Sequence, residues 1–239
     1  MRPLEHGLRQ GLADLALTLD DHAIQQLLDY LDLIQKWTKV YNLTAVRNPA
    51  DMLTHHLLDS LAVIAPLRAQ LAAMRIAGVM PIKADLAGVA DAASLAPDRT
   101  AKVRLLDVGS GAGLPGVVIA ICCPEVAVDC VDTVAKKAAF IQQVAVSLHL
   151  QNLRGLNARV ESLTDKYQVV SARAFASLVD FTTWSVGALA EQGVWLGMKG
   201  KHPGDEIAAL PPSVYVFHVE PLKVPGLDAE RCIVWMRRV

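Results

Sequence analysis

A glycine-rich turn between a hydrophobic strand and a helix constrains the fold of this chain more than any other feature. The turn reads Asp107-Val-Gly-Ser-Gly-Ala-Gly-Leu-Pro-Gly116 and follows the predicted strand Arg104–Val108. Glycines let the backbone turn tightly and leave room for a ligand at the carboxyl edge of a sheet. We expect Pro115 to be the first residue of the following helix. A G-x-G-x-x-G string is weak alone, and the flanking strand and helix make it informative.

Strands and helices alternate after this turn, which predicts a parallel sheet with right-handed crossovers. The last two strands are separated by a Pro/Gly turn region, so we expect a terminal antiparallel hairpin. The predicted fold class is therefore α/β and Rossmann-like, with a mostly parallel seven-stranded sheet and helices on both faces. The ranges that carry this pattern are strands 126–131, 168–172, 193–198, 215–219 and 232–237, and helices 133–148 and 178–191.

The residues before the turn predict helices. Ranges 4–19 and 21–41 have helical periodicity, and Asp20–Asp21 can cap the second helix. A third helix is expected over 50–66, ending at Pro66. We predict one compact unit, divided into an N-terminal helical extension (1–68), an irregular, partly helical insertion (69–102) and a Rossmann-like domain (103–239).

Composition excludes some classes of protein. Hydrophobic residues make up 53% of the 239 residues and net charge is −1, so disorder and a uniformly basic surface are both excluded. Residues 1–60 hold 5 Lys/Arg against 8 Asp/Glu, so a nucleic-acid partner would meet a local patch. We expect four buried cysteines, no metal, no signal peptide and no membrane span, which predicts a soluble cytoplasmic protein.

Asp132 ends the second predicted strand, 19 positions after Gly113. A carboxylate there can accept hydrogen bonds from both ribose hydroxyls of an adenosine, or it can cap the next helix, and both roles are compatible. NAD and S-adenosylmethionine both suit a strand, a glycine turn and an acid. Asp107, which can orient the turn or meet the amino-acid end of the cofactor, favours S-adenosylmethionine, as do Leu114-Pro115 and the terminal hairpin.

The fourth strand region reads Ser171-Ala-Arg-Ala-Phe-Ala-Ser177. It contains neither an Asn/Asp-Pro-Pro-aromatic motif for exocyclic amines nor a Pro-Cys nucleophile for cytosine carbon. A target that needs neither device is a ring nitrogen with a lone pair, such as guanine N7, and positioning can then carry the rate without a general base. Arg173 can neutralise a cofactor carboxylate or a substrate phosphate, or it can form a surface salt bridge.

Several segments occur together in one known family. They include Trp37, Tyr41-Asn-Leu-Thr-Ala-Val-Arg47, His55-His56-Leu-Leu-Asp59-Ser60, Leu106–Gly116, Ser171–Ser177, Met198-Lys-Gly200 and Gly204-Asp-Glu-Ile207. In order and spacing the chain closely resembles the RsmG (GidB) family, over nearly its whole length. Range 69–102 departs from the pattern, because most members connect helix and first strand more briefly.

The resemblance implies a class I methyltransferase that transfers a methyl group from S-adenosylmethionine to guanine N7 of small-subunit (16S) ribosomal RNA. It implies cofactor contacts at Gly109, Leu114, Val160, Glu161 and Arg173. To these the residues themselves add Asp107, Gly111 and Asp132. No catalytic residue is assigned.

The expected partner is small-subunit rRNA or the small ribosomal subunit, and the expected state is a monomer without membrane contact. Phosphate contacts are candidates at Lys136, Lys137, Lys199, Lys201, Arg237 and Arg238. His55 and His56 have no assigned role. The alternatives are a ribosome-assembly factor that binds the cofactor without turnover and, with less support, an NAD-dependent oxidoreductase.

Overall fold

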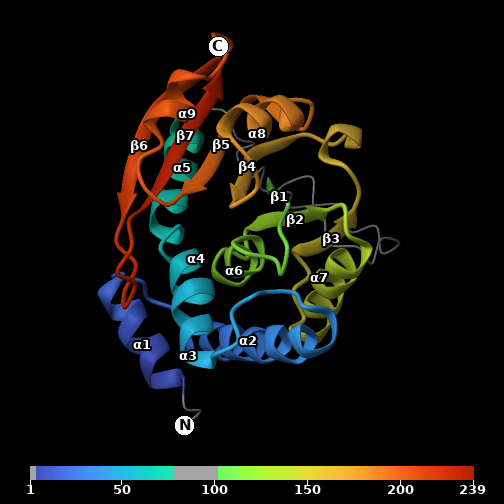
Figure 1. The fold of residues 1–239 in the computed structure, drawn as a ribbon, viewed down its shortest axis with the longest axis vertical. Helices are drawn as coiled ribbons and strands as arrows, with labels where there is room; N and C mark the ends of the chain where they lie inside the picture. The colour runs from blue at the N-terminus through green and yellow to red at the C-terminus, as the bar shows by residue number, and fades with distance from the viewer. Residues whose placement is uncertain (1–3, 78–101) are drawn as a thin grey trace, which may run out of the picture.

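The computed structural model describes residues 4–77 and 102–239. Seven strands in these residues form one sheet in the order β3-β2-β1-β4-β5-β7-β6 (Figure 1). Strands β1 to β5 run parallel, and β7 lies antiparallel between β5 and β6. This topology confirms the predicted mostly parallel sheet and terminal antiparallel pair. The bounds are β1 Val103–Val108, β2 Val126–Asp132, β3 Leu153–Asn157, β4 Tyr167–Arg173, β5 Leu189–Lys199, β6 Val214–Leu222 and β7 Arg231–Arg238.

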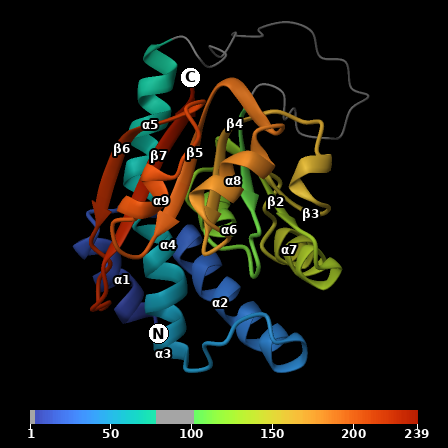
Figure 2. The ribbon, with the colours of Figure 1, turned by 45° about the horizontal axis from the view of Figure 1, so that its top comes forward.

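Helices cover both faces of the sheet. Consecutive side chains of a strand point to opposite faces, so the central strands bury apolar residues on both sides. Leu105 of β1 packs in the core beneath the N-terminal helices, α6 and α7, whereas Leu106 packs in the core beneath α8 (Figure 2). The helices are α1 Glu5–Asp14, α2 Asp21–Tyr41, α3 Pro49–Met52, the π-helical turn η1 Leu53–Leu58, α4 Asp59–Leu61, α5 Ile64–Ile76, α6 Gly116–Cys122, α7 Ala135–Ser147, the 3₁₀ turn η2 Val160–Ser162, α8 Leu178–Ser185 and α9 Gly204–Ala208.

The second helix matches its prediction. Asp20 is its N-cap and accepts a hydrogen bond from the Ala23 N–H at 2.7 Å, which satisfies one of the first-turn donors. Asn42 ends the helix in the left-handed conformation with φ of 51°. An apolar stripe along α2 faces the core, including Leu27, Leu31 and Ile34, each of which is fully buried.

The expected helix end at Pro66 is wrong. Helix α5 begins at Ile64 and continues to Ile76, so Pro66 stands in its first turn. Backbone N–H groups in a first turn have no partner within the helix, and proline is tolerated there for that reason. The helix crosses the predicted boundary between residues 68 and 69, and the rest of the predicted insertion, 78–101, lies outside the described residues.

The expected helix 178–191 is too long. Helix α8 ends at Ser185, and strand β5 already begins at Leu189. The apolar run before Gly193 suits either element, and pairing with β4 decides between them. The Tyr167 N–H donates to the carbonyl of Ala188 at 2.9 Å, and Leu189 is the register partner of Tyr167. Tertiary hydrogen bonds therefore override the local helical pattern.

The continuous helical stretch Pro49–Ile76 has the length and hydropathy of a membrane span. Most of its apolar window, 61%, is buried inside the protein. Leu57, Leu61 and Leu67 of this stretch are fully buried in the main core. Packing against the sheet accounts for its apolar character, as for a core helix.

Candidate functional site

The glycine-rich turn lies at the carboxyl end of β1, and the neighbouring strand holds it there. The N–H groups of Gly109 and Ser110 donate to the carbonyl of Val131 at 2.9 and 3.3 Å. Gly109 has a φ of +64°, and a Cβ at this position would run into the ring of Phe175. Gly113 has a φ of +89°, and a Cβ there would also meet side chains. Both the positive φ and the lack of space for a Cβ therefore require glycine at these two positions.

Asp107 lies beneath the turn. Its fully buried carboxylate accepts hydrogen bonds from the Gly116 N–H and the Ser171 hydroxyl, each at 2.9 Å. Burial raises the pKa of Asp107 to about 6, and these hydrogen bonds oppose the rise. The contacts support the first of its two possible roles, which is to orient the turn and the start of α6. Helix α6 begins at Gly116, so Pro115 immediately precedes it.

Asp132 ends β2 beside the turn and is 7% exposed. One carboxylate oxygen accepts from the Val134 N–H at 2.9 Å, and the other from the Gly111 N–H at 3.2 Å. The ammonium of Lys137 lies 3.3 Å from the second oxygen. A carboxylate has about four lone-pair positions, so one is open to a ligand and a second opens when Lys137 moves. Asp132 therefore ties β2 to the turn and start of the following helix while keeping acceptor capacity.

A cavity of about 470 Å³ opens beside Gly109 and Asp132. Val160 and Glu161, on the short turn after β3, line it, as the family resemblance implies for cofactor contacts. Phe175 and Trp184 line it from the side of α8, with their rings edge to face at 5.7 Å. The cavity combines apolar surfaces with two carboxylates, which suits an adenosine.

Four predicted cofactor residues lie outside the lining of this cavity, and one of them is Asp107, which lies beneath the turn. Leu114 is 4% exposed and packs in the main core, and Gly111 meets the cavity through its hydrogen bond to Asp132. Arg173 ends β4 and lines a second cavity of about 370 Å³. Ala174, which has a φ of 50°, lines both cavities, so they meet across it. A positive φ in a residue other than glycine costs free energy and is frequent at functional sites.

Asp59 organises the charges of the second cavity. Its carboxylate, 3% exposed, accepts from the guanidinium of Arg173 at 2.8 Å and from that of Arg231 at 2.8 Å. Arg173 also donates to the carbonyl of His55 at 3.0 Å. Arg173 is thus neither a surface salt bridge nor a side chain directed into the first cavity. One carboxylate faces two guanidiniums, which leaves an excess of positive charge.

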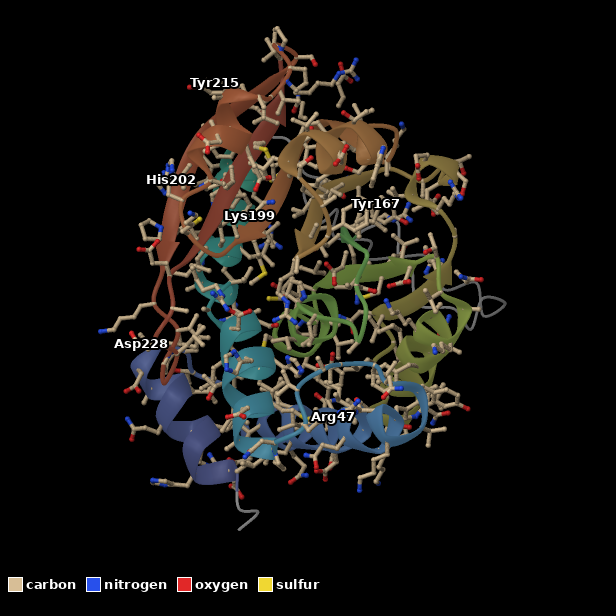
Figure 3. All side chains as sticks on the ribbon, viewed as in Figure 1. Arg47, Tyr167, Lys199, His202, Tyr215 and Asp228 are labelled. Atoms are coloured by element: carbon tan, nitrogen blue, oxygen red, sulfur yellow. The ribbon has the colours of Figure 1, made fainter. Side chains whose placement is uncertain are left out.

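Lys199 and the two histidines complete the second cavity. The ammonium of Lys199 (Figure 3) lies 2.7 Å from the carboxylate of Glu206 and donates to the carbonyl of Ala176 at 2.9 Å. His56 is buried, which lowers its pKa, and its Nε2 lies 2.9 Å from the hydroxyl of Thr44. The π-helical turn η1 carries both histidines, and such turns are frequent at functional sites.

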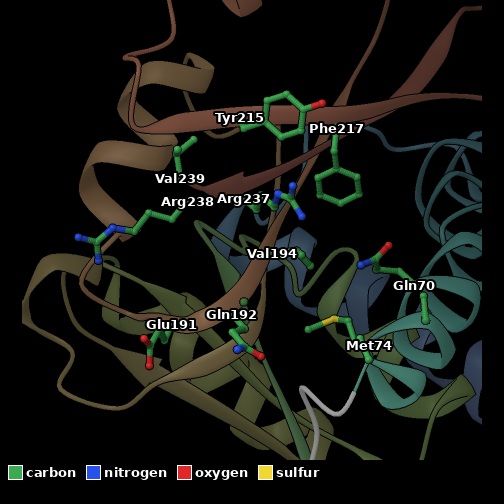
Figure 4. Close-up of a pocket in the computed structure, with 13 residues that line it drawn as sticks. Gln70, Met74, Glu191, Gln192, Val194, Tyr215, Phe217, Arg237, Arg238 and Val239 are labelled. Carbon is green, nitrogen blue, oxygen red and sulfur yellow. The ribbon is translucent and has the colours of Figure 1, made fainter.

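A larger cavity, about 870 Å³, lies away from both of these (Figure 4). It lies where β5 begins and β7 ends, and Arg237 is packed over the ring of Tyr215 at 5.3 Å. Parallel α/β sheets bind ligands at the carboxyl ends of their strands, which is the opposite edge. Of the predicted phosphate contacts, Arg237 and Arg238 belong to this remote cavity, whereas Lys137 and Lys199 belong to the two cavities beside the turn.

Sequence analysis assigned no role to several residues of the two cavities beside the turn, among them Asp59, Phe175, Trp184 and Arg231. Arg231 is the first residue of β7, and because β7 runs antiparallel, this residue lies at the carboxyl edge of the parallel strands. The position of Arg231 follows from the sequence once the last strand is placed antiparallel beside β5. Asp59, an acid placed between the apolar pairs Leu57-Leu58 and Leu61-Ala62, was a usable signal for a buried ion pair. No sequence signal distinguishes Phe175 or Trp184 from core aromatics.

The described residues contain no cluster of three His, Cys, Asp or Glu side chains arranged to hold a metal ion. All four cysteines are buried and unbonded to one another, as expected. Burial raises the pKa of Cys123 to about 11, which keeps its thiol protonated and unreactive.

Sequence comparison identifies the family. A family described as "GidB: rRNA small subunit methyltransferase G" matches residues 23–74 and 86–234. The chain is 67% identical to the ribosomal RNA small subunit methyltransferase G of Albidiferax ferrireducens over 239 residues, which covers 100% of this chain and 99% of the relative. Its identity to the protein of that name from Acidovorax ebreus is 61% over 236 residues, covering 99% and 96%.

Among solved structures, TrmN from Thermus thermophilus has a TM-score of 0.49 and 17% identity, covering 71% of this chain and 48% of that chain. The near-complete coverage and high identity of the sequence relatives decide the assignment. The chain belongs to the rRNA small subunit methyltransferase G (GidB) family.

Proposed function

We propose that this protein transfers a methyl group from S-adenosylmethionine to N7 of a guanosine in small-subunit (16S) rRNA. The observation that carries the proposal is the meeting of two differently built cavities across Ala174 at the carboxyl edge of the sheet. One carries carboxylates and apolar walls, and the other carries an excess of cations. A methyl donor and a polyanionic acceptor need such a pair of neighbouring sites.

The cavity beside the glycine turn is the proposed cofactor site. Asp132 accepts from the ribose hydroxyls, and Glu161 lies near the adenine. When bound, S-adenosylmethionine supplies a methyl group on a positively charged sulfur. Asp107 acts from below by holding the turn and the start of α6. The family resemblance implies direct cofactor contacts at Leu114 and Arg173. The position of Leu114 favours a role in supporting the turn. The position of Arg173 favours a role in the second cavity, which we call the acceptor cavity.

The second cavity is the proposed site of the target guanosine. Arg173 and Arg231 face one carboxylate, so their combined charge suits the phosphate of a nucleotide. Guanine N7 has a lone pair and no proton to lose, so the site needs no general base. The task of the protein is to place N7 in line with the methyl group and to exclude water. The deep major groove of A-form RNA hides N7, so the target base lies in a loop or is otherwise exposed.

The test uses methyl-labelled S-adenosylmethionine and small ribosomal subunits from a strain that lacks the gene. After digestion of the RNA, mass spectrometry identifies the labelled nucleoside. We expect label in N7-methylguanosine, and we expect Asp132→Ala to remove it. The matched control is Asp228→Ala, an exposed acid on the β6–β7 connection far from both cavities (Figure 3).

Failure has a definite meaning. Cofactor binding without transfer to subunits, assembly intermediates or protein-free rRNA would reject the rRNA activity and favour a binding role in ribosome assembly. Quenching of NADH fluorescence on titration would favour an oxidoreductase instead. We also propose that the protein acts in the cytoplasm as a monomer, and sedimentation equilibrium measures the second point.

A further inference from the structure

The end of helix α2 presents an aromatic surface to solvent. Tyr41 is 41% exposed and its neighbour Val40 is 70% exposed, although both belong to the last turn of a helix whose apolar stripe is buried. The Tyr41 ring lies 5.0 Å from that of Trp37, one helical turn earlier. We call Trp37, Lys39, Val40, Tyr41 and Arg47 the Tyr41 platform.

The platform is rigid because it ends a ladder of packed rings. Trp37 lies 5.2 Å from the fully buried ring of Phe140, and Phe140 lies 6.5 Å from that of Tyr30. The Tyr30 hydroxyl donates to the carbonyl of Ala112 in the glycine turn at 2.6 Å. An exposed ring held in this way loses little conformational entropy when a flat ligand stacks on it.

The chain segment that carries the platform is positively charged. No Asp or Glu occurs between Asp32 and Asp51, whereas Lys36, Lys39 and Arg47 all fall in this interval. These are three of the five Lys and Arg residues in the first 60, a region that is acidic as a whole. An exposed aromatic ring among cations is the arrangement that binds single-stranded nucleic acid.

The loop after α2 links the platform to the proposed acceptor cavity. Arg47 donates to the Thr38 carbonyl at 3.1 Å and to the Asn42 side chain at 2.7 Å, which fixes the loop after α2 (Figure 3). Within that loop, the Thr44 hydroxyl lies 2.9 Å from His56 Nε2, and His56 lines the acceptor cavity. The loop after α2 therefore joins the platform to a side chain that lines the acceptor cavity.

We infer that the Tyr41 platform binds single-stranded rRNA beside the target guanosine, with one base stacked on Tyr41 and phosphates near Lys39 and Arg47. The inference rests on the proposed function for its choice of partner. Stacking tolerates any base, because every base has a π-face. The platform thus contributes affinity, and the acceptor cavity selects the atom that is methylated.

Four proteins test the inference: wild type, Tyr41→Phe, Tyr41→Ala and Tyr215→Ala. Tyr215 is a matched control, since it is 50% exposed and carries a nearby arginine but lines the remote cavity. Methyl transfer to small subunits from a strain lacking the gene gives kcat and KM, and equilibrium binding gives the cofactor Kd. We expect Tyr41→Ala to raise KM roughly 5- to 150-fold, the range for one stacked base. We expect kcat, cofactor Kd and the circular dichroism spectrum to stay unchanged.

The pattern across variants decides the outcome. Tyr41→Phe keeps the ring and should match wild type, as should Tyr215→Ala. A KM for Tyr41→Ala within twofold of wild type, or an equal defect in Tyr41→Phe, overturns the stacking role. Filter binding then identifies the partner. Loss of affinity for protein-free small-subunit rRNA supports RNA, whereas loss confined to assembled subunits indicates a ribosomal protein and overturns the inference. If wild type binds but transfers no methyl group, the proposed function fails, and the same binding comparison still decides the platform.

Discussion

The carboxylate of Asp59 lies 2.8 Å from the guanidinium of Arg173, although 114 positions separate the two residues in the chain. Asp59 comes from the N-terminal helices and Arg173 from the end of β4. Arg231 reaches the same carboxylate from β7. The acceptor cavity is therefore shared between the helical N-terminal region and the sheet, and neither part builds it alone.

Replacing Asp59 with Asn should disable the acceptor cavity while sparing the cofactor site. The amide leaves two guanidiniums without a compensating charge, and loss of one partner from a buried ion pair costs about 3 kcal/mol. We expect kcat/KM for subunits to fall at least about tenfold, since a 1.4 kcal/mol loss of transition-state stabilisation already gives that factor. Urea unfolding measures stability, and Asp51→Asn, an exposed acid in the same helical stretch, serves as control. A wild-type kcat/KM in Asp59→Asn would contradict this role.

Gly109→Ala should abolish cofactor binding with a smaller effect on stability. The added methyl group meets the Phe175 ring, and the positive φ adds strain of about 1 kcal/mol. Isothermal titration with S-adenosylmethionine measures the result, and we expect a Kd raised more than about tenfold. Gly187→Ala is the matched control, because nothing lies within 4 Å of a Cβ there. Equal affinities for the two variants would show that the turn does not shape the cofactor site.

Asp107→Asn should change how stability depends on pH. Because the folded pKa of about 6 exceeds the unfolded value of 3.8, the native state binds more protons than the unfolded state between these values. Unfolding free energy therefore falls as pH rises through this window, by about 3 kcal/mol in total from this group once the pH is well above 6. The asparagine oxygen can accept from the Gly116 N–H while its amide nitrogen donates to the Ser171 hydroxyl, and the side chain does not titrate. Denaturant titrations at a series of pH values should show the unfolding free energy of the wild type falling relative to that of Asp107→Asn as pH rises. Parallel plots of unfolding free energy against pH for the two proteins would refute the buried ionisation.

Trp184 should report cofactor binding by its fluorescence. It lines the cofactor cavity and is 40% exposed, whereas Trp195 and Trp235 are buried in the core. We expect S-adenosylmethionine to change the emission of the wild type. Trp184→Phe should remove most of that change and keep the aromatic contact with Phe175. An undiminished signal in Trp184→Phe would place the responsible tryptophan elsewhere.

Local patterns were enough to predict the sheet and the glycine turn. Strand Val103–Val108 is buried along most of its length and is apolar except for Arg104 and Asp107. Gly109 and Gly113 occupy conformations that disfavour other residues. The errors have a common physical source. The end of α8 depends on pairing between Leu189 and Tyr167, and the partner of Arg173 depends on packing between helix and sheet. Neither contact leaves a periodic signal, because each joins segments that are distant in sequence.

The position of β7 between β5 and β6 also sets a temporal order. Arg231 is made 172 residues after Asp59 and is the last of the acceptor-cavity residues to leave the ribosome during synthesis. A nascent or truncated chain that stops before β7 has the glycine turn but lacks this second guanidinium and the strand that joins β5 to β6. Strand β7 therefore supplies one of the two guanidiniums that face Asp59, and a chain that lacks β7 cannot complete the acceptor cavity.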